Sequence, residues 1–296
     1  MSSAQPTPDE GVVDGDSKWY TETIGPQPTS GSVSVDGVSI AYRVWGDSTS
    51  ALANVVFVHG GAAQSAWWDH IAPRIASDRR VAALDLSGHG DSGRRDHYYL
   101  QTWAREILAV SEATAPGNRP ILVAHSMGGA SAVQVASVFP DRISGLILVD
   151  PLPHDVTSEE VRTRTAERFS KQRVYDTRSL AVERFRLLPE QRTDGAVLAH
   201  IAHNSVREVE SGWSWKHDPA IYQVERGVPS DAEDIVCPVA VIHPEHGLSD
   251  KTGALVFGGP IPISRSVVVP GAAHHVMLDE PEAFLSCLRE ILADWP

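Results

Sequence analysis

Six short runs of apolar residues recur along the chain, and they constrain its fold more than any other feature. The runs lie at residues 54–60, 80–86, 120–126, 145–151, 238–244 and 266–271. Continuous runs of this length are typical of strands buried on both faces, as in a parallel sheet. Helical patterns separate most of them, at 66–77, 98–114, 127–139 and 281–294. Strands alternating with helices predict an α/β fold, with a mostly parallel, twisted sheet flanked by helices.

The remaining segments suggest how the chain is divided. Residues 1–30 are rich in Pro, Ser, Thr, Gly and Asp, which predicts a flexible N-terminal tail. The stretch "GSVSVDGVSIAYRVWG" alternates apolar and polar residues around Asp36-Gly37, which predicts a hairpin. Residues 152–235 have helical patterns and no strand-like run, and a structureless loop of that length is implausible. We therefore expect a helical cap at 152–235, inserted after the sixth strand, and a core made from 31–151 and 236–296.

Composition excludes several classes of protein. The 296 residues carry a net charge of −13 and no basic run, so a nucleic-acid partner is not expected. No apolar stretch is long enough to span a membrane, and the polar N-terminus does not resemble a signal peptide. Only two cysteines occur, which argues against a disulfide framework. We expect a cytoplasmic monomer or homodimer whose partner is a small-molecule substrate.

The stretch "ILVAHSMGGASAVQVA" places Ser126 between a buried strand and a helix. A side chain at the apex of so sharp a turn requires small residues two positions before and after it. Here they are Ala124 and Gly128, a variant of the G-x-S-x-G nucleophile elbow with Ala in the first position. The alternative is an ordinary strand-to-helix turn in which the serine caps the helix.

Three further segments resemble the α/β-hydrolase fold family. "VVFVHGG" is similar to the family's first long strand and oxyanion loop, and "AALDLSGHGDSG" to its D-x-x-G-x-G-x-S segment. "VVVPGAAHHVMLDEPEAF" resembles the G-x-G-H-x…P-E-x-F ending, with Ala273 where glycine is frequent. The resemblance covers about residues 31–296 and implies a Ser-His-acid triad.

Of the thirteen histidines, His274 stands where the family has its catalytic base. His275 is the alternative. His125 neighbours the serine along the chain, and such a neighbour is expected to point away from the site. His59 is expected to brace the loop that follows its strand, and His89 to be a structural loop residue. No histidine shows metal-ligand spacing, so neither a metal nor a cofactor is predicted.

An oxyanion hole needs two backbone donors. The resemblance assigns one to Met127, the residue after the nucleophile, and the other to Gly61 in the loop after the first long strand. The alternative for Gly60-Gly61 is an ordinary tight turn.

The sequence leaves more than one position open for the triad acid. In the family it usually follows the strand before last, but an ungapped alignment puts Gly247 in that position. Asp250 would fill the position if the loop carried a small insertion, and Glu245 lies close to the strand end. Some members carry the acid after an earlier strand, where this chain has Asp150. We favour Asp150 and retain Asp250 as the alternative.

A triad of this kind catalyses acyl transfer. The resemblance therefore implies a serine hydrolase acting on a small or medium carboxylic ester, lactone or thioester. A carbon–carbon bond hydrolase or a cofactor-independent oxygenase on the same fold is one alternative, and a non-catalytic ligand-binding protein is another. Trp213 and Trp215 of the cap, with Gly60 and His125, are candidates for the substrate pocket. The tryptophans could instead serve only to seat the cap on the sheet.

Overall fold

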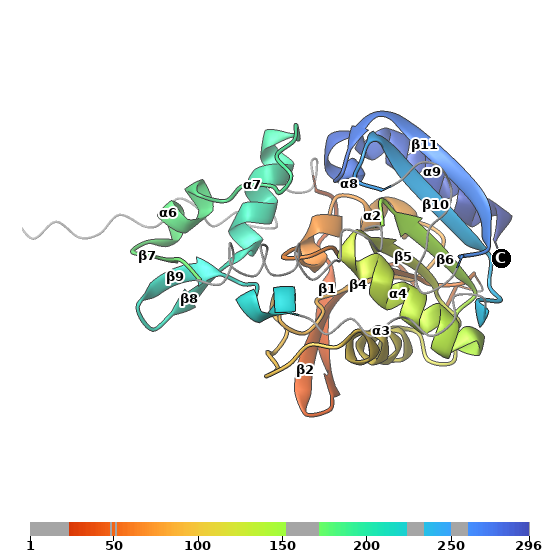
Figure 1. The fold of residues 1–296 in the computed structure, drawn as a ribbon, viewed down its shortest axis with the longest axis horizontal. Helices are drawn as coiled ribbons and strands as arrows, with labels where there is room; N and C mark the ends of the chain where they lie inside the picture. Colours follow the sequence, from red (N-terminus) through yellow and green to blue (C-terminus); the bar gives the residue numbers. More distant parts are fainter. Residues whose placement is uncertain are drawn as a thin grey trace, which may run out of the picture.

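A computed structural model describes residues 24–47, 49–50, 52–151, 172–223, 234–249 and 260–295. Its centre is an eight-stranded sheet in the order β1-β2-β4-β3-β5-β6-β10-β11 (Figure 1). β1 and β2 form the predicted antiparallel hairpin, and from β4 to β11 neighbouring strands are parallel. The six apolar runs become β3 to β6, β10 and β11, which confirms the predicted fold class. The strands are β1 (Thr29–Val35), β2 (Val38–Trp45), β3 (Val55–Val58), β4 (Val81–Leu84), β5 (Ile121–His125), β6 (Gly145–Val149), β10 (Val239–His246) and β11 (Ile263–Ala273).

Both faces of the sheet are covered, which explains why its strands are continuously apolar. Along β3, Val56 and Val58 pack into one core and Val55 and Phe57 into the other. The first core is closed by α3 (Leu100–Thr114) and α4 (Met127–Val138). The second is closed by η1 (Ser65–Trp68), α2 (Ala72–Ile75), α8 (Val276–Asp279) and α9 (Pro281–Asp294). A short 3-10 helix, η2 (Pro140–Arg142), precedes β6.

The single helix predicted at 66–77 is wrong. The segment forms a 3-10 turn, η1, followed by the separate short helix α2. Pro73 stands in the first turn of α2. Proline has no N–H to donate and is tolerated at a helix start but not in an interior, so it begins a new helix here.

The segment between β6 and β10 was predicted to be helical, but its described part also contains strands. Its described part, residues 172–223, includes the small antiparallel sheet β7-β9-β8, which lies beside the main sheet in Figure 1. Strands as short as two to four residues with a Glu-Ser-Gly turn escape a search for apolar runs. The elements are β7 (Val174–Tyr175), α6 (Arg178–Glu183), α7 (Gly195–Asn204), β8 (Val206–Val209), β9 (Gly212–Trp215) and η4 (Pro219–Gln223).

Part of the segment predicted as a tail packs against the core. Residues 1–23 of the predicted tail lie outside the described residues, but Ile24 is buried in the second core. Trp45 Nε1 also donates to the carbonyl of Pro26. Cys237 and Cys287 are both free. Among the described helices, none has the length and apolar character needed to cross a membrane.

Buried His70 makes the stability of this core sensitive to acid. Its Nε2 lies 2.6 Å from the Met277 carbonyl, so that nitrogen carries the proton. Burial lowers the pKa of His70 to about 4, against an ordinary value of 6.5, and the bond to Met277 and nearby Asp69 only partly oppose this. The unfolded chain therefore binds more protons than the folded chain between these values. The stability contributed by the neutral ring is present above about pH 6.5 and is lost as pH falls toward 4.

A His70→Gln variant tests this. Its amide can still donate to the Met277 carbonyl but does not titrate. The unfolding free energy of the wild type, relative to that of the variant, should therefore fall by about 2 kcal/mol from about pH 8 to about pH 5. Urea denaturation at both values measures it. A difference that is independent of pH would show that burial does not hold this ring neutral.

Candidate active site

Ser126 lies at a strained turn between β5 and α4. Its φ is 52° and its ψ is −122°, a region that residues with a side chain rarely adopt. The turn requires close contact with β3, because a Cβ on Gly128 would lie 2.4 Å from the carbonyl oxygen of His59. Ala124, two residues before the serine, is completely buried. Gly128 is thus small for the expected physical reason, and the bend projects the serine from the carboxyl edge of the sheet.

Ser126, His274 and Asp150 form a continuous hydrogen-bonded chain. His274 Nε2 lies 3.0 Å from Ser126 Oγ, and His274 Nδ1 lies 2.6 Å from Asp150 Oδ2. All three side chains are buried. The N–H at His274 Nδ1 donates a hydrogen bond to Asp150, which leaves the lone pair of Nε2 directed at the serine hydroxyl. This is the arrangement in which imidazole can take a proton from serine.

Asp150 follows the end of β6, and Gly247, which follows β10, leaves room for its carboxylate. Asp150 has a φ of 39°, and its carboxylate accepts from the backbone N–H groups of Leu248 and Ser249, both at 2.8 Å. A Cβ on Gly247 would lie 2.6 Å from Asp150 Oδ1. Gly247, the position where the alignment expected an acid, has no side chain, and the carboxylate of Asp150 fills the space beside it. The alternative acid Asp250 lies outside the described residues.

These contacts also keep the acid ionised. Burial raises the pKa of Asp150, but the hydrogen bonds from His274, Ser249 and Leu248 outweigh it and hold the pKa well below its ordinary value. The carboxylate thus remains negative at neutral pH. It can stabilise a positive charge on His274 when that ring takes a proton.

Two backbone N–H groups are available near the serine. The Cβ position of Gly61 lies 3.9 Å from Met127 Cβ, so the two predicted oxyanion residues are neighbours. Neither N–H donates in a hydrogen bond between described residues. Met127 is the first residue of α4, whose N-terminus favours negative charge. Gly60 packs closely against this group, since a Cβ on it would lie 3.2 Å from Ser126 Cβ.

His59 braces the loop that follows β3, the role expected of it. Its Nε2 accepts from the Leu86 N–H at 3.0 Å, and its Nδ1 donates to the Gly60 carbonyl at 2.7 Å. The D-x-x-G-x-G-x-S segment supports the same loop, because Asp85 accepts from the Ser65 N–H. His89 packs against the His59 ring with its centroid 4.7 Å away, consistent with a structural role.

His125 does not point away from the site, contrary to prediction. Its ring centroid lies 4.7 Å from that of His274, and its Nε2 lies 3.0 Å from the His274 carbonyl. The strained turn at Ser126 ends the strand alternation, and the loop after β11 folds back over the end of β5. His275, the alternative base, contacts neither Ser126 nor Asp150 in the hydrogen bonds of the described residues; its Nε2 lies 3.2 Å from the Leu188 carbonyl.

Burial keeps both of these flanking rings neutral. Burial lowers the pKa of His125 well below its ordinary value, with His274 and His275 adding to the effect. Burial and then His274 lower the pKa of His275 to about 3. The site therefore holds two neutral imidazoles beside His274.

Trp213 and Trp215 contact other residues of the segment between β6 and β10. Arg178 lies over the Trp213 ring at 5.9 Å, and Trp215 packs against Tyr175 with a centroid distance of 5.6 Å. Trp215 Nε1 donates to the Ala181 carbonyl. These contacts lie within the segment itself, so a place for the tryptophans in the substrate pocket and a role in seating the segment on the sheet both stay predictions.

Sequence reasoning missed Gln191, which precedes α7 and holds the histidine loop. Its Oε1 accepts from the His275 N–H at 2.9 Å, and its Nε2 donates to the His275 carbonyl at 3.1 Å. The segment between β6 and β10 is thereby tied to the backbone next to His274. No sequence pattern marks a lone glutamine that bonds a distant backbone.

The geometry of the site and its position at the carboxyl edge of a parallel sheet define a triad-bearing α/β protein. Comparison with known families agrees: the family model of the alpha/beta hydrolase fold matches residues 53–281. The chain belongs to this family.

Individual relatives are distant. The chain is 25% identical to esterase Rv0045c of Mycobacterium tuberculosis, over 90% of each protein. It is 26% identical to the pimeloyl-[acyl-carrier protein] methyl ester esterase of Edwardsiella ictaluri, covering 83% of this chain and 95% of the relative. The crystal structure of E-2-(acetamidomethylene)succinate hydrolase superposes with a TM-score of 0.72 at 22% identity, covering 90% of this chain and 99% of that one.

The contact between Gly247 and Asp150 leads to a prediction. A Gly247→Ala side chain would displace the carboxylate from His274, and a misplacement of about 1 Å can reduce turnover about 100-fold. We therefore expect kcat to fall by about that factor with little change in substrate affinity. Gly195→Ala is the matched control, because nothing lies within 4 Å of its Cβ position. Equal kcat values for the two variants would show that Gly247 is not needed to make room for the acid.

Proposed function

We propose that this protein is a serine hydrolase that cleaves a small or medium carboxylic ester, lactone or thioester through an acyl-enzyme. Ser126 is the nucleophile, His274 the general base and acid, and Asp150 the residue that orients His274. The contact that carries the proposal is the one between Ser126 Oγ and His274 Nε2, at 3.0 Å. We propose no cofactor for the reaction.

Each step follows from the hydrogen bonds. Ser126 Oγ attacks the substrate carbonyl while its proton passes to His274 Nε2, and Asp150 stabilises the resulting imidazolium through Nδ1. The N–H groups of Gly61 and Met127 stabilise the negative oxygen of the tetrahedral intermediate. His274 then protonates the departing alcohol or thiol. Water, deprotonated by the same ring, attacks the acyl-enzyme and releases the carboxylic acid.

Three observations support this reaction over its rivals. Two of the relatives described above are named esterases. A serine at the elbow can form an acyl intermediate, whereas a proton-abstracting oxygenase would need only the His274–Asp150 pair. A non-catalytic binding protein would gain nothing from a strained serine held against an imidazole and an ionised acid.

The test of the nucleophile uses p-nitrophenyl esters of increasing chain length. We expect wild-type turnover, and a loss of at least about 10⁴-fold in kcat in Ser126→Ala, because a missing nucleophile leaves only the oxyanion hole and binding. Undiminished turnover in Ser126→Ala would exclude the acyl-enzyme. Activity that requires His274 but not Ser126, on an enolisable substrate consuming O₂, would favour the oxygenase.

The acid is assigned by a second pair of variants. Asp150→Asn should lose about 10⁴-fold in kcat, because an amide cannot hold the imidazole in the required tautomer. Asp250→Asn should retain wild-type kcat. The reverse pattern would transfer the role to Asp250.

A further inference from the structure

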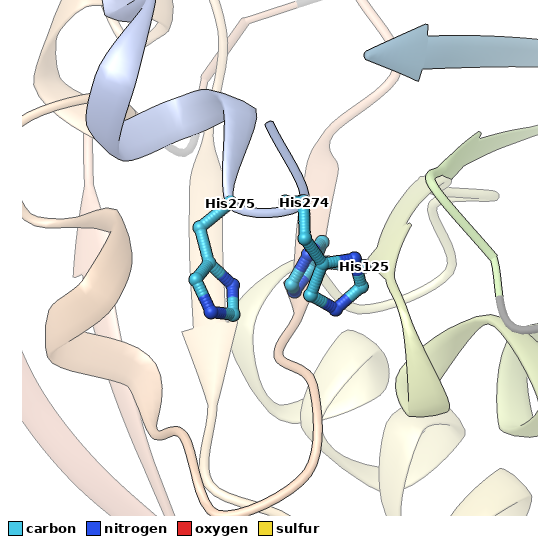
Figure 2. Close-up of side chains that lie close together, drawn as sticks. All are labelled: His125, His274 and His275. Atoms are coloured by element: carbon cyan, nitrogen blue, oxygen red, sulfur yellow. The ribbon is translucent and has the colours of Figure 1, made fainter. Parts of the chain in front are cut away.

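Three buried imidazoles lie close together, His125 from the end of β5 and the consecutive His274 and His275 from just after β11 (Figure 2). The ring centroids of His274 lie 4.7 Å from those of both His125 and His275, and His125 and His275 are 5.4 Å apart. Each side chain offers one nitrogen, and these three nitrogens lie within 4.8 Å of one another. No ring is more than 4% exposed. Histidine nitrogen is the ligand that Zn²⁺ and related borderline transition metals prefer.

The second observation is that each ring has one nitrogen fixed by an oxygen acceptor. Nε2 of His125 faces the His274 carbonyl, and Nε2 of His275 faces the Leu188 carbonyl. A carbonyl can only accept, so both rings carry their proton on Nε2 and their lone pair on Nδ1. Nδ1 of His275 is buried and has no hydrogen-bond partner among the described residues. An unpaired lone pair in the interior is costly unless something binds it.

His274 completes the pattern. Its Nδ1 donates to Asp150, which leaves a lone pair on Nε2. A carboxylate behind the protonated nitrogen of a histidine ligand is the arrangement that orients metal-binding imidazoles and strengthens their basicity. The contacts that would make His274 a good base would therefore also make it a good metal ligand.

We propose that His125, His274 and His275 form an inhibitory site for a divalent transition cation such as Zn²⁺. The cation binds one nitrogen of each ring, and Ser126 Oγ or water completes a tetrahedral shell. Coordination of His274 Nε2 removes the lone pair that would take the proton of Ser126, so the metal-bound protein cannot activate its nucleophile. The inhibitory consequence rests on the proposed function, whereas metal binding itself does not.

Binding is tested on the full chain, cleared of metal with EDTA and desalted. Isothermal titration with Zn²⁺ should give one equivalent bound to wild type. His275→Gln removes one ligand and should weaken binding by at least about 10-fold, the lower range for disturbing even an outer partner of a metal site. His70→Gln is the matched control, because His70 is also buried, also faces a carbonyl through Nε2 and also has an unpartnered Nδ1. It should bind Zn²⁺ like wild type.

Co²⁺ absorption and inhibition by Zn²⁺ test the site independently of the variants. Co²⁺ added to wild type should give the visible absorption bands of a tetrahedral site, which needs no variant to fold. Zn²⁺ should abolish p-nitrophenyl ester turnover, and EDTA should restore it. Metal binding that depends on His275 in a protein without esterase activity would support the site and refute the proposed hydrolase. Turnover insensitive to Zn²⁺, or equal affinity in wild type and His275→Gln, would overturn the site.

Discussion

The candidate site depends on one strained residue. Ser126 adopts a φ of 52°, and beside it α4 approaches the end of β3 so closely that Gly128 has no room for a Cβ. Strain of this kind persists when the surrounding structure over-determines it. Here the surroundings are two buried cores packed on either side of parallel strands, so the rigid sheet sets the direction of the serine hydroxyl.

The partners of Ser126 come to it because neighbouring parallel strands end at one edge of the sheet. Ser126 directly follows β5, and Asp150 directly follows the adjacent β6. The loop after β10 supplies the backbone donors to Asp150, and the loop after β11 supplies His274. Residues 124 positions apart in sequence thereby make a 2.6 Å contact. The arrangement holds the acid between two strand ends, and Gly247 is the residue that leaves space for it.

Much of the fold and of the candidate site could be predicted from the sequence, and the parts that could not have physical reasons. The parallel sheet and the serine turn follow from local patterns: continuous apolar runs, and small residues around Ser126. The juxtaposition of Ser126 with His274 followed from family resemblance and not from spacing. The small sheet of residues 174–215 was missed because its strands are too short to show periodicity. The histidine cluster was missed because His125 and His275 approach each other only through the tertiary fold, and strand alternation suggested the wrong direction for His125.

The central claim is that Ser126 is nucleophilic because His274 activates it. The most direct measurement is peptide mapping by mass spectrometry after brief exposure to a p-nitrophenyl alkylphosphonate, a reagent that phosphonylates activated serines. We expect a single adduct on Ser126 in wild type and much slower labelling of that residue in His274→Gln. An adduct on another residue, or labelling of Ser126 at the same rate in both proteins, would contradict it.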